Sequence, residues 1–91
     1  MTPEKVLEVI EVYRQLFLKR GIGKIDYPHD EILDQAEVGL EHCHGMLDQM
    51  IEFVHKGKIE KAFRWLGFVQ GVLWTNGIYT LSQLRDHNRP P

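Results

Sequence analysis

The feature that most constrains the fold is a run of residues, 65–84, without a single charged side chain. Apolar residues recur through its first half and just before it at alternating spacings of three and four, namely at Ile59, Ala62, Leu66, Val69 and Leu73. This spacing is typical of the buried face of an amphipathic helix. Further apolar residues fill most of the remaining circumference: Phe63, Trp65, Phe68, Val72 and Trp74. The pattern predicts a central helix that is covered by other helices of the chain or by a second copy of it.

The uncharged run has the length of a membrane span, about 20 residues. Polar residues interrupt it, however, at Gln70 and Thr75, and Asn76-Gly77 is typical of the end of a helix. The continuous apolar part is therefore shorter than a span, and we expect a buried core helix without membrane association.

A chain of 91 residues suits a single domain, residues 1–91, and its 43% hydrophobic and 26% charged residues are ordinary for a globular protein. Its single cysteine, Cys43, rules out an internal disulfide. The first residues carry acids and lack the apolar core of a signal peptide. We therefore expect a cytoplasmic protein.

A first helix should begin at Thr2-Pro3-Glu4, which offers a capping hydroxyl, a proline in the first turn and an acid at the positive helix end. Its buried stripe should comprise Val6, Val9 or Ile10, Tyr13, and Leu16 or Phe17, and Gly21 should end it. Residues 21–29 should form a loop that is held onto the core by its apolar side chains, Ile22, Ile25 and Tyr27.

A second helix should run from Asp30 to Lys56, because acids stand at its start and Gly57 follows its end. Its apolar residues alternate strictly in spacings of three and four: Leu33, Ala36, Leu40, Cys43, Leu47, Met50 and Val54. This pattern predicts near-parallel packing in a bundle. The short connection through Gly57 makes the second and third helices an antiparallel hairpin.

A short last helix should follow Gly77, because Thr80-Leu81-Ser82-Gln83 matches the capping-box pattern. Proline at position 90 prevents it from continuing far beyond Asn88. The predicted fold is thus all-α, a small bundle of three substantial helices and a short C-terminal one.

One stretch of the second helix suggests a metal site. Acidic residues and one histidine repeat at spacings of three and four, one residue out of step with the apolar stripe: Asp34, Glu37, Glu41, His44 and Asp48. The pair Glu41-x-x-His44 is the motif by which some helical bundles hold iron or manganese. The predicted ligands are Glu37, Glu41, His44 and Asp48, for iron, manganese or zinc, with a second motif supplied by an antiparallel dimer. The alternative is an ordinary solvated face paired with nearby lysines and arginines.

No catalytic or cofactor-binding residue is predicted. Cys43 lies between His42 and His44, but neighbouring residues of a helix point about 100° apart, so neither imidazole faces the thiol. Cys43 also falls on the apolar stripe, where a cysteine behaves as a small hydrophobe. Phosphate-binding loops, serine-nucleophile turns and zinc-type cysteine pairs are missing from the sequence. The sequence therefore favours a non-enzymatic protein.

A nucleic-acid interface is a further alternative. The last two helices could imitate a helix-turn-helix, with Arg85, His87, Asn88 and Arg89 on its second helix. That helix also carries Asp86, and the chain has a net charge of −2, whereas a DNA-binding protein usually presents a basic patch. The charge pattern therefore favours a protein partner over nucleic acid.

The segment 61–90, preceded by residues 42–50, resembles a group of small helical proteins encoded by tailed phages and related prophages. The likeness covers about half of the chain and rests on Arg64-Trp65-Leu66-Gly67-Phe68, Gln70-Gly71 and Leu73-Trp74. The function of these proteins is unknown, so the resemblance implies a phage context and assigns no activity or site.

Together these features predict an interaction or accessory protein that self-associates, as a dimer, or binds a host or phage protein. Aromatic residues and arginines are the usual anchors of such interfaces. The predicted contact residues are Trp65, Phe68, Trp74 and Tyr79. The alternative for each of them is a place in the interior.

Overall fold

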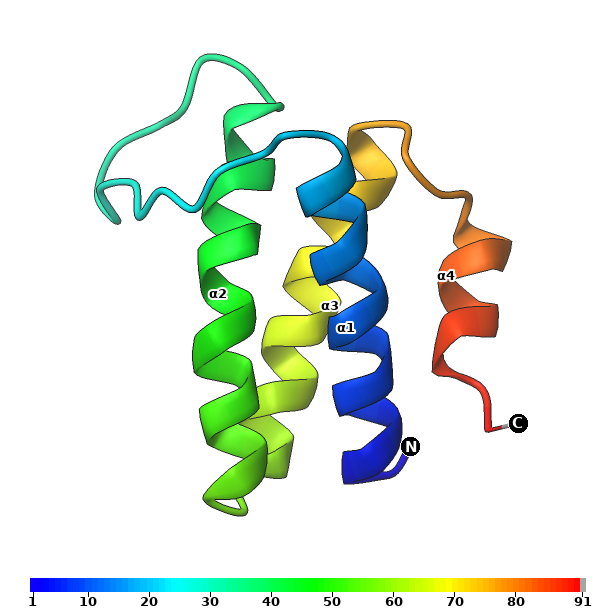
Figure 1. Ribbon diagram of the computed structural model, residues 1–91. Helices are drawn as coiled ribbons and strands as arrows, with labels where there is room; N and C mark the ends of the chain where they lie inside the picture. The colour runs from blue at the N-terminus through cyan, green and yellow to red at the C-terminus, as the bar shows by residue number, and fades with distance from the viewer. Residues whose placement is uncertain (91) are drawn as a thin grey trace.

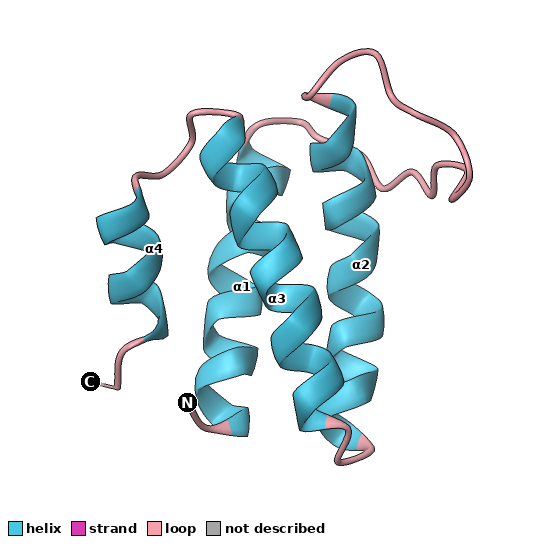
Figure 2. Ribbon diagram, turned by 180° about the vertical axis from the view of Figure 1, so that it is seen from behind, coloured by secondary structure: helices cyan, strands magenta, loops and turns pink. Residues whose placement is uncertain are grey.

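The computed structural model describes residues 1–90, which form four α-helices and no strand (Figure 1). They are α1 (Pro3–Lys19), α2 (Val38–His55), α3 (Ile59–Thr75) and α4 (Leu81–Asn88). The three long helices lie side by side, α2 and α3 form an antiparallel hairpin, and the short α4 packs beside α1 (Figures 1 and 2). The predicted all-α bundle and its hairpin are confirmed.

The helices begin and end where local sequence signals require it. The Thr2 hydroxyl accepts a hydrogen bond from the Lys5 amide at 3.1 Å, and Thr80 and Gln83 form the predicted capping box at the start of α4. Each long helix ends at a glycine with positive φ, at Gly21, Gly57 and Gly77. In each case the amide after the glycine bonds the carbonyl five residues earlier, which satisfies an acceptor that the helix end leaves free.

The core lies where the facing sides of the three long helices meet. It comprises Val6, Val9, Ile10, Tyr13 and Phe17 of α1, Leu40, Cys43, Leu47 and Met50 of α2, and Ala62, Leu66, Val69 and Leu73 of α3, with further contributions from Met46 and Leu84. The predicted stripes of the first and third helices are therefore confirmed.

The second helix is shorter than its sequence pattern predicts. It begins at Val38 instead of Asp30, and Leu33 and Ala36 are exposed rather than buried. The reason is the finite length of the bundle, because Gly39 already lies against Val72 near the end of α3. Eight further helical residues would lengthen α2 by about 12 Å beyond Val38 and carry it past the end of α3, which could not cover their apolar side. Residues 30–37 instead pass outside the bundle, and Ile32 is 96% exposed.

None of the helices within residues 1–90 combines the length and the hydropathy that crossing a bilayer requires. The apolar character of α3 is used instead in packing against α1 and α2, which cover its buried stripe.

Candidate functional site

A cleft of about 530 Å³ lies between the 26–33 segment and the neighbouring sides of α2 and α3. Its apolar lining includes Met46, Trp65 and Phe68, and its polar lining includes the side chains of Asp26, His29 and His42. An apolar cleft with a few polar groups is the usual composition of a ligand-binding site.

The loop that forms one wall of this cleft is tied to α2 through Glu41. The Ile25 amide donates to the Glu41 carbonyl at 3.2 Å, and the Tyr27 hydroxyl donates to the Glu41 carboxylate at 2.7 Å. The hydrogen bond to Glu41 raises the pKa of Tyr27, because it favours the protonated phenol. Ile22 packs against the core as predicted, whereas Ile25 remains largely exposed.

Three side chains of the types that bind metal ions lie together at the cleft. Among residues 1–90, Asp26, His29 and His42 form the one group of three whose donor atoms all lie within 4.8 Å of one another. Oδ1 of Asp26 is 3.2 Å from Nε2 of His29 and 3.6 Å from Nδ1 of His42. The sequence pattern did not identify these three residues as a group, because they become neighbours only when the loop folds back along α2.

The four residues predicted as metal ligands have separate environments. Glu37 is exposed at the start of α2, and Glu41 accepts the Tyr27 hydrogen bond. His44 is buried and packs on Phe17, with ring centroids 5.1 Å apart. Asp48 takes part in ion pairs on the surface.

His44 contributes to the interior of the bundle. Its Nδ1 lies 2.8 Å from the carbonyl oxygen of Ile22, and because a carbonyl only accepts, Nδ1 carries the proton. Its Nε2 is buried and has no hydrogen-bond partner among the described residues. The ring thus secures the start of the loop after α1 from inside the core.

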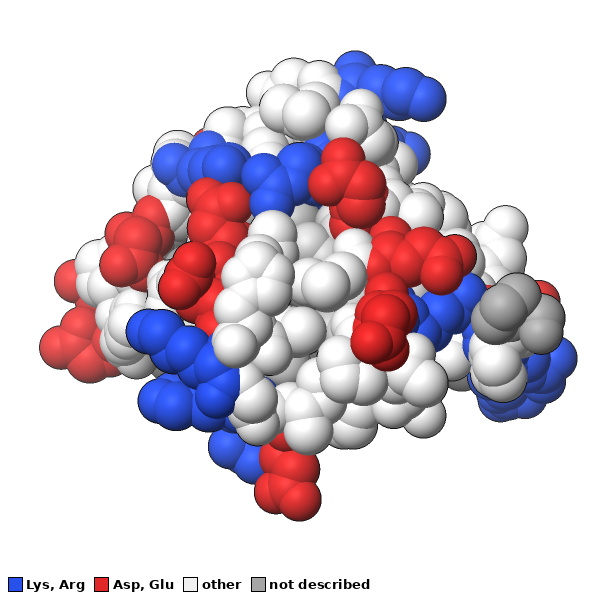
Figure 3. Space-filling model, turned by 60° about the horizontal axis from the view of Figure 1, so that its bottom comes forward, with Lys and Arg blue, Asp and Glu red and all other residues white. Residues whose placement is uncertain are grey.

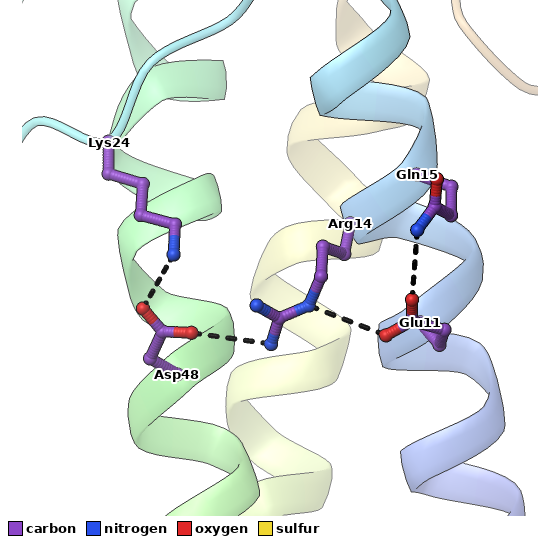
Figure 4. Close-up of polar contacts among 5 residues, drawn as sticks. All are labelled: Glu11, Arg14, Gln15, Lys24 and Asp48. Atoms are coloured by element: carbon purple, nitrogen blue, oxygen red, sulfur yellow. Dashed lines mark hydrogen bonds and ion pairs between the residues drawn. The ribbon is translucent and has the colours of Figure 1, made fainter.

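Asp48 joins three segments of the chain (Figure 4). It pairs with Lys24 of the loop at 2.8 Å and with Arg14 of α1 at 3.3 Å, and Arg14 also contacts Glu11 at 3.4 Å. The hydrogen bond from Lys24 is the main cause that lowers the pKa of Asp48. Because the carboxylate is half exposed, these pairs contribute little to stability, on the order of 1 kcal/mol or less.

The four predicted contact aromatics divide into two groups. Phe68 and Trp74 are 55% and 48% exposed and lie outside the core to which the same helix contributes. Trp65 is half-buried and packs edge-to-face on Phe53, with centroids 4.8 Å apart. Tyr79 lies in a cluster with Tyr13 and His87.

Cys43 is fully buried, and burial raises the pKa of its thiol to about 12. A thiol that stays protonated is a poor nucleophile. Its place in the core agrees with its position on the apolar stripe.

A buried polar network attaches α4 to the bundle. The Gln70 side chain donates to the Tyr13 hydroxyl at 2.9 Å and exchanges two hydrogen bonds with the Asn88 amide. The Tyr13 hydroxyl in turn lies 2.9 Å from Nδ1 of His87. Two of the residues considered for DNA contact, His87 and Asn88, are therefore engaged inside the molecule. Only Gln70, a polar residue flanked by apolar ones in the uncharged run, gave a sequence signal for the network.

The surface charge is mixed. On the face shown in Figure 3, acidic and basic side chains surround an uncharged central area. Nucleic-acid-binding proteins usually gather charge of one sign.

No protein-family model, curated protein or solved structure matches the chain. Function is therefore inferred from its own surfaces and side chains.

Proposed function

We propose that the protein is a small helical interaction protein that self-associates through the outer face of α3. The supporting observation is that Phe68 and Trp74 remain about half exposed on the uncharged part of this helix. In the view of Figure 2, α3 crosses the front of the bundle with no other helix over it.

The shape of this face favours a second copy of the chain as its partner. At about 100° per residue, Gly67 and Gly71 lie between Phe68 and Trp74 around the helix. No atom lies within 4 Å of a methyl group added at either glycine, so bare backbone is open to solvent between two large rings. A two-fold dimer requires a self-complementary patch. This patch is self-complementary if an aromatic ring of each copy packs over the glycines of the other.

The apolar surface continues beyond α3. Trp74 borders a shallow groove lined by residues 77–83, and Leu81 of α4 is exposed there. A standard interface buries about 800 Å² on each partner, which is more than one side of the 17-residue α3 supplies. The interface therefore includes the start of α4. We also propose that the protein acts in a phage context. The alternative partner for the same face of α3 is then a host or phage protein.

Analytical ultracentrifugation of tag-free protein tests the proposal. The wild type should sediment as a dimer, whereas Phe68→Glu and Trp74→Glu should sediment as monomers, because each buries a charge in the apolar interface. Val12→Glu is the matched control, since Val12 is a similarly exposed apolar residue on α1. A wild type that stays monomeric at high concentration would refute self-association, as would equal dissociation of the control.

A further inference from the structure

We propose that Asp26, His29 and His42 bind one divalent metal ion of the zinc class. The distances between their donor atoms suit such an ion. Zinc bonds to histidine nitrogen and carboxylate oxygen measure about 2.1 Å, so neighbouring ligand atoms of a tetrahedral ion lie about 3.4 Å apart. The observed separations of 3.2 Å and 3.6 Å from Oδ1 of Asp26 lie on either side of this value.

The donor set selects the kind of metal. Two imidazole nitrogens and one carboxylate oxygen suit zinc and its neighbours cobalt, nickel and ferrous iron, whereas magnesium and calcium prefer oxygen ligands alone. Three protein ligands leave a fourth position for water or a small anion, as in sites where zinc is not purely structural. Because all three residues line the cleft, that position is accessible from it.

The three side chains lie near one another without a metal. Asp26 and His29 are three residues apart on the loop, and His42 is partly buried on α2. The Ile25–Glu41 backbone hydrogen bond fixes the loop next to His42. The Tyr27 amide donates to Nδ1 of His42 at 3.3 Å, so the lone pair of this nitrogen already faces the loop. A metal ion would replace this long hydrogen bond.

All ligands come from one chain and do not require the dimer proposed above. The Trp74→Glu variant should therefore bind metal like the wild type, which separates the two proposals experimentally.

Isothermal titration calorimetry of tag-free protein with zinc chloride, together with visible absorption of the cobalt complex, tests the site. The expected result is one ion per chain and an absorption spectrum of a four-coordinate cobalt ion. His29→Ala is the cleanest variant, because this side chain is 79% exposed and the fold does not depend on it. Loss of a group that merely orients a ligand weakens metal binding by about 10–100-fold, so loss of a ligand should weaken it at least 100-fold.

Two controls decide between this site and others. His55→Ala removes an exposed histidine outside the cluster and should leave the affinity unchanged. Glu41→Gln tests the stripe predicted from the sequence; because the glutamine carbonyl oxygen can still accept the Tyr27 hydrogen bond that ties the loop to α2, it should reduce the affinity far less than His29→Ala. Absence of stoichiometric binding would overturn the proposal. So would binding that is retained in both His29→Ala and Asp26→Asn, or binding that is lost in His55→Ala or Glu41→Gln.

Discussion

At the residue scale, His44 shows how one spacing serves two different roles. Glu41-x-x-His44 has the form of a metal-ligand pair, but the same spacing arises wherever a histidine at the edge of an apolar stripe turns inward. The deciding contacts come from outside α2: the Phe17 ring and the Ile22 carbonyl. Because Ile22 and Phe17 lie 22 and 27 residues from His44 in sequence, the pattern within α2 could not reveal them.

We predict that His44→Ala lowers the free energy of unfolding by about 2–3 kcal/mol, because it leaves a cavity in the core and an unpaired carbonyl at Ile22. Urea denaturation followed by circular dichroism measures the change. His55→Ala, at an exposed site, should stay within about 0.5 kcal/mol of the wild type. Equal stability of the two variants would contradict the structural role of His44.

At the element scale, α4 is attached by polar contacts more than by apolar burial. Leu84 is its one buried side chain, while Asn88 and His87 bond to Gln70 and Tyr13. The capping box and the end of this helix were predictable, because both depend on neighbouring residues. The hydrogen bonds that attach this helix to the bundle were not predictable, because they depend on Tyr13, which lies 74 residues from His87.

We predict that α4 loosens in mild acid. Burial lowers the pKa of His87, an effect that Lys5 reinforces and Asp86 opposes, so the unfolded chain binds a proton more readily than the native one. The stability contributed by neutral His87 is therefore fully present above the ordinary histidine pKa of about 6.5. It is lost as pH falls through the lower pKa that His87 has in the native state.

Hydrogen exchange of the α4 amides at pH 7 and pH 5 measures this loosening. Protection should decrease at pH 5 in the wild type and stay constant in His87→Gln, whose side chain can accept the Tyr13 hydrogen bond but does not titrate in this range. An equal decrease in both proteins would show that another group is responsible.

At the scale of the whole molecule, the sequence predicted the helices and their buried stripes, but not where the bundle ends. The spacing of Leu33 and Ala36 continues the stripe of α2, yet its partner α3 ends three residues after Val72, which lies beside Gly39. The cluster of Asp26, His29 and His42 also follows from the complete fold, since it forms only when the loop returns along α2.

The proposed dimer makes a prediction in which stability and association change in opposite directions. Gly71→Ala should raise the stability of the monomer by roughly 0.5–1 kcal/mol, because alanine loses less backbone entropy in a helix and the added methyl group meets no atom within 4 Å. The same methyl group should weaken the dimer, because it occupies the surface where two helices approach closely. The free energy of unfolding and the dimer dissociation constant are measured on the same samples. Unfolding is followed at protein concentrations below that dissociation constant, since association would otherwise add to the apparent stability.

Gly45→Ala is the matched control for this prediction. Gly45 belongs to α2, and its methyl group would make an ordinary contact with Lys24 at 4.0 Å, so it should stabilise the chain without blocking the close approach of two α3 helices. If Gly71→Ala dimerises as tightly as Gly45→Ala while Phe68→Glu is monomeric, close backbone approach is excluded. The interface would then depend on the aromatic side chains alone, with the helices held further apart.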